Sequence, residues 1–207
     1  GYIGRLNYSY KDKYMLELLA RCDASYLYAP GKRWGFFPGV SAGWRISDEA
    51  FFAPLKDAVN DLKLRVSVGQ TGSEAGVGMF GYLSGYNFNK GGAVLDGKYV
   101  IGVQPGGMPV TDLSWEKNTT YDAGVDMKFL DNRLSLSFDI FKKVISGRPA
   151  ARYDILLPSE VGYSLPNENL NKDEYRGMEG MISYADNVGE LEYNVSAVSY
   201  THLTLPD

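Results

Sequence analysis

The chain of 207 residues is poor in cysteine, in histidine and in long apolar runs. Its single cysteine, Cys22, cannot form an internal disulfide, and together with the single histidine, His202, it cannot supply a Cys/His zinc site. No apolar run reaches the roughly 18 residues that a membrane-spanning helix needs. With 21 basic against 25 acidic residues and no block of Lys or Arg, the sequence also lacks the charge pattern of a nucleic-acid-binding protein. We expect no cofactor and no metal.

Tyrosine and glycine are abundant, with 16 and 24 residues, and apolar and polar side chains alternate along much of the chain. In residues 34–47 the apolar side chains fall at every second position, and only Phe37 interrupts the polar face. A helix would scatter such residues around its circumference, so the pattern predicts β-strands. At most a turn or two of helix is expected, at residues 55–62. About eight strands are predicted, and the other seven lie at residues 2–8, 14–20, 62–69, 121–129, 132–142, 178–184 and 191–197.

The predicted connections alternate between long and short. Residues 11–13, 130–133 and 187–190 are tight turns, whereas residues 70–113 and 144–175 form long connections. This alternation indicates an up-and-down antiparallel meander with all its long loops at one end. Outer-membrane β-barrels have short periplasmic turns and long outer loops, whereas structureless loops of this length are rare in compact soluble domains.

The alternation by itself fits two architectures. In a soluble sheet the apolar face is the core, whereas in a transmembrane barrel it faces lipid and the polar face lies inside. Aromatic residues near the strand ends, polar faces that mix small and charged residues, and the lack of helices to cover the apolar face favour the barrel.

Several segments resemble the barrel of SusC/RagA-type TonB-dependent transporters, the outer-membrane nutrient receptors of Bacteroidota. The most specific is GKRWGFFP at residues 31–38, which runs into VSAGWRIS at residues 40–47. It follows a stretch at residues 1–17 that resembles the hairpin preceding it in the family. The family's order continues with LKLRVSVGQTG, LSWEKNTTYDAGVD and RGMEG, at residues 62–72, 113–126 and 176–180.

The resemblance implies an all-β fold that is part of a large antiparallel transmembrane β-barrel in the bacterial outer membrane. It implies import of a glycan, oligosaccharide or peptide without enzymatic activity, powered by the TonB complex acting on an N-terminal plug and assisted by a SusD-like surface lipoprotein. Residues 1–200 are predicted to be a partial receptor barrel, with the plug absent and the chain truncated at both ends. Residues 201–207 are predicted to be a doubtful tail, of the kind left by adapter read-through. The alternative is a secreted or surface β-sheet module that binds glycans.

Four aromatic residues in the long connection at residues 70–113 are the candidate substrate contacts. Tyr82, Tyr86, Phe88 and Tyr99 lie among Asn and Gly, and aromatic faces beside amide donors suit stacking on sugar rings. Ordinary packing within the loop is the competing interpretation. In the same connection, residues 76–81 match G-x-G-x-x-G, but the Gly- and Asn-rich sequence that follows does not predict the helix a dinucleotide site requires.

Carboxylates on the predicted polar faces are the remaining candidates for chemistry. On strand faces of this kind, solvation or pairing with Arg on a neighbouring strand is expected before acid/base catalysis. No nucleophile elbow, phosphate loop or calcium loop accompanies them, so a surface hydrolase is not predicted. The carboxylates are Asp122, Asp126, Asp139, Glu179 and Glu192.

Overall fold

The computed structural model describes the whole chain except residues 153, 157, 159–164, 190 and 207. It is dominated by β-strands, with two short 3-10 helices, η1 (Ile46–Asp48) and η2 (Ala50–Leu55). Within the described residues, no helix has the length and apolarity to cross a bilayer. The strands are β1 (Tyr2–Tyr10), β2 (Tyr14–Ala24), β3 (Trp34–Arg45), β4 (Asp61–Ser73), β5 (Tyr86–Leu95), β6 (Lys98–Pro105), β7 (Glu116–Phe129), β8 (Leu134–Ala151), β9 (Asn167–Val188) and β10 (Leu191–Pro206).

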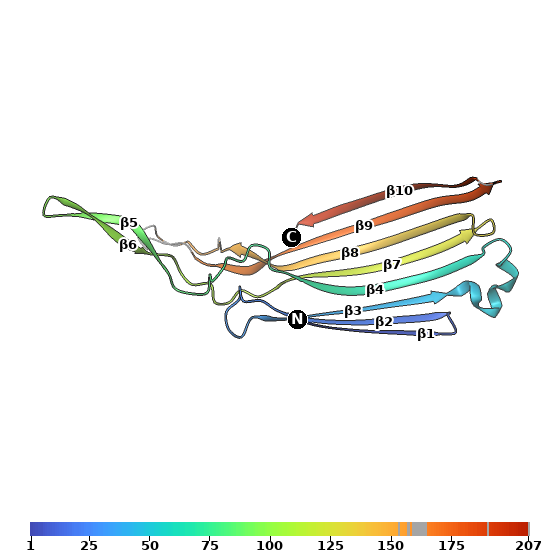
Figure 1. Ribbon diagram of the computed structural model, residues 1–207, viewed down its shortest axis with the longest axis horizontal. Helices are drawn as coiled ribbons and strands as arrows, with labels where there is room; N and C mark the ends of the chain where they lie inside the picture. The colour runs from blue at the N-terminus through green and yellow to red at the C-terminus, as the bar shows by residue number, and fades with distance from the viewer. Residues whose placement is uncertain (153, 157, 159–164, 190, 207) are drawn as a thin grey trace.

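Eight of the strands form one antiparallel sheet in the order β1-β2-β3-β4-β7-β8-β9-β10. Figure 1 shows them side by side as a single layer, with the β5–β6 hairpin projecting beyond one end. The predicted all-β meander of about eight strands is confirmed. The described residues form no second layer against this sheet, so large apolar side chains such as Leu6, Val66 and Ile140 are 52% to 61% exposed.

The strand register carries the apolar face unbroken from strand to strand. Leu18 lies opposite Leu6 on β1 and Val40 on β3, and Val40 lies opposite Val68 on β4. Residues at odd positions of β3 and β4, such as Arg65, share the other face with the polar residues of β7 and β8. We call these two surfaces the apolar face and the polar face.

The tight turns lie at one end of the sheet and the longest connection, between β4 and β7, lies at the other, as predicted, whereas the β3–β4 connection at the turn end is longer than the β2–β3 connection opposite it. The two ends are called the turn end and the long-loop end. At the turn end, Lys11 and Asp12 have φ of 52° and 53°, and residues 130–132 adopt the same left-handed conformation, which reverses the chain tightly. The connection between β3 and β4, with η1 and η2, lies at this end (Figure 1).

Three boundaries differ from the sequence prediction. The helical turns form at residues 46–55 rather than 55–62, where buried Phe52 anchors them and β4 already begins at Asp61. β8 and β9 pair as far as Ala151 and Asn167, so the predicted loop at residues 144–175 is much shorter. β10 continues through residues 201–206 in register with β9.

The β5–β6 hairpin is the fourth difference, because its residues were predicted to be loop. Its turn is Asp96-Gly97, with φ of 51° and 72°, the left-handed pair that a type I′ turn requires. A register shift between Phe88 and Gly92 interrupts the pairing, which breaks the regular alternation expected of a strand.

Candidate functional site

The β5–β6 hairpin carries three of the four predicted contact residues on one face. Tyr86 and Phe88 lie opposite Pro105 and Val103, and Tyr99 lies opposite Val94. The side chains of Tyr86, Phe88 and Tyr99 are 66%, 74% and 69% exposed. The register places Val94, Ile101 and Val103 on the same face, and we call this surface the hairpin face. It offers aromatic and aliphatic contact area without a neighbouring layer in the described residues.

Tyr82 is not part of the hairpin face. It lies in the turn region before β5, is half-buried, and its hydroxyl accepts a hydrogen bond of 3.4 Å from Nη2 of Arg33. Arg33 in turn donates through Nε to the Tyr28 carbonyl at 3.2 Å. The structure therefore places Tyr82 at the base of the long connection, where it contacts the segment between β2 and β3.

A buried aromatic cluster holds this base in place, and the alternation of the sequence does not predict it. Tyr28, Phe37 and Trp115 are 1%, 2% and 9% exposed, and the Trp115 ring lies 5.3 Å and 5.4 Å from the Tyr28 and Phe37 rings. The Trp115 indole donates a 2.9 Å hydrogen bond to the Arg33 carbonyl. The one available signal was Phe37, the aromatic residue that interrupts the polar face of its strand.

The cluster fills a fork in the sheet. The pairing of β3 with β4 ends at Gly39 and Gly69, and beyond this point β3 pairs with β2 and β4 with β7. A side chain at Gly72 would collide with the Phe37 ring, so glycine is needed there for the ring to enter. Burial raises the pKa of Tyr28 to about 12, which keeps its hydroxyl neutral in this apolar setting.

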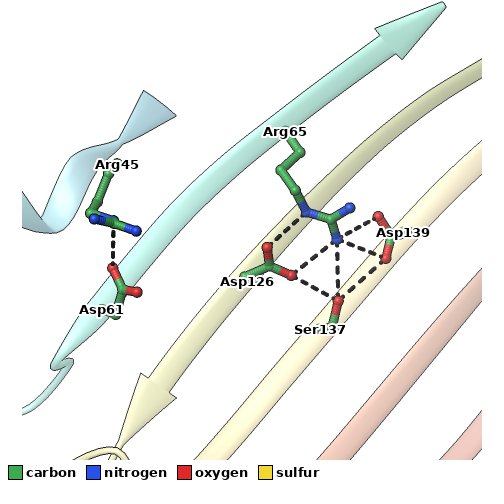
Figure 2. A network of polar contacts seen from close by, with 6 residues as sticks. All are labelled: Arg45, Asp61, Arg65, Asp126, Ser137 and Asp139. Atoms are coloured by element: carbon green, nitrogen blue, oxygen red, sulfur yellow. Dashed lines mark hydrogen bonds and ion pairs between the residues drawn. The ribbon is translucent and has the colours of Figure 1, made fainter. Parts of the chain in front are cut away.

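An ion-pair network lies on the polar face where β4, β7 and β8 run side by side (Figure 2). Arg65 of β4 contacts Asp126 of β7 through Nε at 2.7 Å and Asp139 of β8 through Nη2 at 2.9 Å. Ser137 donates a 2.9 Å hydrogen bond to Asp126. Gly124 lies opposite both Arg65 and Asp139, and its missing side chain lets this pair reach across β7.

Two of the five candidate carboxylates belong to this network. Asp126 and Asp139 are paired with an arginine on neighbouring strands, as predicted, and this arrangement joins three strands. Asp122 and Arg65 line a shallow hollow of about 560 Å³ on the polar face. Among the described residues, no cluster of three or more His, Cys, Asp or Glu could hold a metal ion.

A second polar cluster lies at the turn end and orients aromatic residues of the apolar face. Glu49 accepts hydrogen bonds from the Tyr14 hydroxyl at 2.6 Å, from Nε1 of Trp44 at 3.2 Å and from Nζ of Lys13 at 3.3 Å. The Tyr14 hydrogen bond contributes most to lowering the pKa of the Glu49 carboxyl, followed by the Trp44 hydrogen bond and then by Lys13. Tyr14 also stacks on Trp44, with ring centroids 6.5 Å apart.

The apolar face carries a second aromatic stack toward the long-loop end. Tyr2 and Trp34 lie with ring centroids 6.0 Å apart and an interplanar angle of 13°. On β3, Trp34 and Trp44 are separated by apolar-face positions that carry no charged residue: Phe36, Pro38, Val40 and Ala42. The apolar face of this strand is thus a charge-free band with an aromatic stack at each end.

Comparison with known proteins identifies one family. The family described as "TonB dependent receptor-like, beta-barrel" matches residues 1–206. TonB-dependent receptor P39 of Formosa agariphila is 33% identical over 183 residues, which cover 86% of this chain and 16% of the relative. TonB-dependent receptor SusC of Bacteroides thetaiotaomicron is 32% identical over 206 residues, 94% of this chain and 20% of the relative.

A solved structure shares the fold. The structure of the RagAB peptide importer in its "open-open" state superposes with a TM-score of 0.80 and 20% sequence identity, covering 98% of this chain and 21% of that chain. The chain therefore spans about a fifth of the length of these proteins, and it corresponds to one section of their β-structure.

Proposed function

Since this chain belongs to the TonB-dependent receptor β-barrel family, we propose that it forms part of the wall of an outer-membrane barrel that imports nutrients. The observation that carries the proposal is the charge-free band on the apolar face of β3, which lies between two aromatic stacks and is backed by a polar face with paired charges. Members of this family are transporters of the outer membrane rather than enzymes, which fits a site built for contact and not for bond cleavage.

The dimensions of the band support membrane insertion. Trp34 and Trp44 are ten residues apart on β3, which corresponds to about 33 Å along a strand at roughly 3.3 Å per residue. For the usual barrel tilt of about 40°, the height across the membrane is about 25 Å, the thickness of the apolar band of such barrels. The aromatic stacks would then lie at the two lipid–water interfaces, where Trp and Tyr are enriched.

The substrate is proposed to be an oligosaccharide or a peptide, with the long-loop end outside the cell. The exposed rings of Tyr86, Phe88 and Tyr99 support this, because aromatic faces stack on sugar rings and also pack on peptide side chains. Their common position on the hairpin face would let one ligand contact all three. The cluster around Trp115 holds the base of the hairpin, so the contact surface projects from a fixed point.

Two partners are proposed from the family. The TonB complex would act through the plug, and a SusD-like surface lipoprotein would cover the long-loop end of the barrel. The related RagAB structure is a peptide importer and SusC is a TonB-dependent receptor. The β5–β6 hairpin projects beyond the sheet in Figure 1, and we propose that such a lipoprotein contacts the hairpin face together with the substrate.

The experiment is an uptake assay on the full-length receptor that contains this segment. Replacing Tyr86, Phe88 and Tyr99 together by Ala should reduce uptake of the cognate oligosaccharide or peptide by about tenfold or more, since each lost stacking contact is worth about 0.5–1.5 kcal/mol. The matched control replaces Asn87, Lys98 and Gln104, which the register places on the opposite face of the hairpin.

Equal loss in both variants, with equal amounts of receptor in the outer membrane, would contradict the assignment of substrate contacts. Recovery of the full-length protein as a soluble monomer without detergent would contradict the transporter proposal itself. Such a result would favour a surface β-sheet module that binds glycans.

A further inference from the structure

Charged side chains begin abruptly at the long-loop end of the apolar face on β8 and β9. From Leu134 to Ile140 the apolar-face positions of β8 are all apolar, and the next one is Lys142. On β9 the same face runs from Tyr184 to Met178, and the next position is Arg176. Lys142 and Arg176 lie directly opposite one another in the register.

Glu174 pairs with both cations, and its single negative charge leaves the three side chains with a net positive charge. Nζ of Lys142 lies 2.8 Å from its Oε2, and Nη2 of Arg176 lies 2.6 Å from its Oε1. One carboxylate therefore serves two cations, and the side chain of Arg176 is still 59% exposed while that of Lys142 is 40% exposed. Both cations keep N–H donors for a further ligand.

Two more cations lie on the same face, two apolar-face positions further toward the loops. Ser146 on β8 lies opposite Lys117 of β7 and Lys172 of β9, and both lysines are exposed. The patch of Lys117, Lys142, Lys172, Arg176 and Glu174 thus carries four positive charges and one negative charge. We call it the basic patch.

The position of the basic patch matches the level of lipid headgroups. Leu134 and Lys142 are eight residues apart on β8, about 26 Å along the strand and about 20 Å in height for a tilt of about 40°. Tyr121 lies opposite Lys142 on β7, so an amphipathic ring adjoins the cations at this level. Lys and Arg at the edge of an apolar band extend their charged ends toward the headgroups.

We propose that the basic patch binds phosphate groups on the headgroups of anionic glycolipids in the outer leaflet, with Lys142 and Arg176 as the central contacts. Arg presents paired N–H donors that match phosphate oxygens, and Lys supplies a compact positive charge. This inference rests on the proposed function, because it requires the apolar face to contact lipid and the long-loop end to lie outside.

The test uses the full-length receptor in nanodiscs of zwitterionic phospholipid that contain a trace of lipid A. Lipid A retained on the protein after a brief detergent wash is counted by mass spectrometry, with dephosphorylated lipid A as the second probe. The wild type should retain the phosphorylated lipid preferentially. The variant Lys142→Gln with Arg176→Gln should weaken retention about thirtyfold, since each cation near an anionic surface contributes about fivefold.

The matched control is Lys63→Gln with Lys128→Gln, which removes the same charge from the polar face. It should retain lipid A like the wild type. Equal retention of both lipids by the wild type, an equal loss in the control, or displacement of lipid A by millimolar inorganic phosphate would overturn the headgroup assignment. A protein that does not enter nanodiscs at all would instead overturn the proposed function on which this inference depends.

Discussion

Replacing Arg65 by Met should destabilise the protein measurably, because Arg65 contacts both Asp126 and Asp139 within 3 Å. Methionine keeps much of the length and apolar volume of the side chain but removes the charge. The two carboxylates, held on adjacent strands, would then lose the guanidinium group that pairs with both of them.

The expected magnitude lies between two known limits. At about 4 Å and an effective dielectric constant of about 20, each ion pair is worth about 4 kcal/mol before the cost of desolvation. Removing one partner of a fully buried pair costs about 3–5 kcal/mol, whereas exposed pairs are worth about 1 kcal/mol or less. The Arg65 side chain is 35% exposed and that of Asp139 is 13% exposed. We therefore expect a loss of about 2–3 kcal/mol in the free energy of unfolding.

Urea unfolding of the full-length receptor in detergent micelles, followed by tryptophan fluorescence, measures this loss. The matched control is Arg5→Met, because Arg5 and Glu17 are 4.0 Å apart with side chains 58% and 40% exposed, so their pair contributes at most about 1 kcal/mol. Adding Asp139→Asn to the Arg65 variant should recover part of the loss. Equal effects of the Arg65 and Arg5 variants would refute the network as a stabilising element.

Three further predictions concern the aromatic cluster and the turn end, all measured by urea unfolding in micelles. Gly72→Ala should cost about 1–3 kcal/mol because its methyl group would collide with the Phe37 ring, whereas Gly69→Ala, with open space around it, should cost less; equal losses would contradict this. Burial raises the pKa of Tyr28 from 10.0 to about 12, so its contribution to the free energy of unfolding is fully present below pH 10 and is lost as the pH rises toward 12. Tyr28→Phe should remove this pH dependence. An unchanged loss of stability at alkaline pH in the variant would argue against burial of Tyr28 as the cause. The pKa of Glu49 is lowered, so the contribution of its carboxylate to the free energy of unfolding is present above pH 4.5 and is lost as the pH falls through the folded-state pKa. Glu49→Gln should reduce the loss of stability at acid pH. The same acid dependence in the variant would contradict a stabilising role for the Glu49 hydrogen bonds.

The strands of the main sheet could be predicted because each has two chemically different faces. Residues 121–129 and 132–142 alternate almost perfectly; the observed β7 contains the first segment, and β8 contains the second from Leu134 onward. The pairing of Asp126 and Asp139 with an arginine also followed from the alternation, because carboxylates on one strand face lie beside the same face of the next strand. Which arginine it would be depended on register, which the alternation does not fix.

The β5–β6 hairpin could not be recognised from alternation because both of its faces contain apolar residues. Val94 and Leu95 are adjacent in sequence and are 69% and 60% exposed, as are Val100 and Ile101 on the partner strand at 46% and 59%. The useful signal was the turn, since Asp-Gly between two β-branched runs is typical of a type I′ hairpin. Asp96-Gly97 has that composition.

The aromatic cluster was out of reach for a different reason. Trp115 is far along the chain from Tyr28 and Phe37, and the fork between β3 and β4 brings the three rings together. Sequence periodicity describes single strands, so it indicates that Phe37 is an exception on its face but not what it contacts. The contacts of Phe37 depend on which strands pair with β3 on its two sides, and periodicity does not give those partners.

Both faces of the sheet disfavour a shift of the strand register. Arg65 lies between Leu64 and Val66, so a slip of one residue would move Arg65 from the polar face to the apolar face. On the lipid side of a barrel, an arginine near the bilayer midplane costs about 2–4 kcal/mol, and the slip would also break its contacts with Asp126 and Asp139. Contact with lipid alone favours no single register among shifts that keep apolar residues on the lipid side, because a leucine or a valine is accommodated at any position of the band. The polar network on one face and the apolar band on the other therefore stabilise the same register. Substitutions on the polar face that keep the charge pairs intact should leave the strand pairing unchanged.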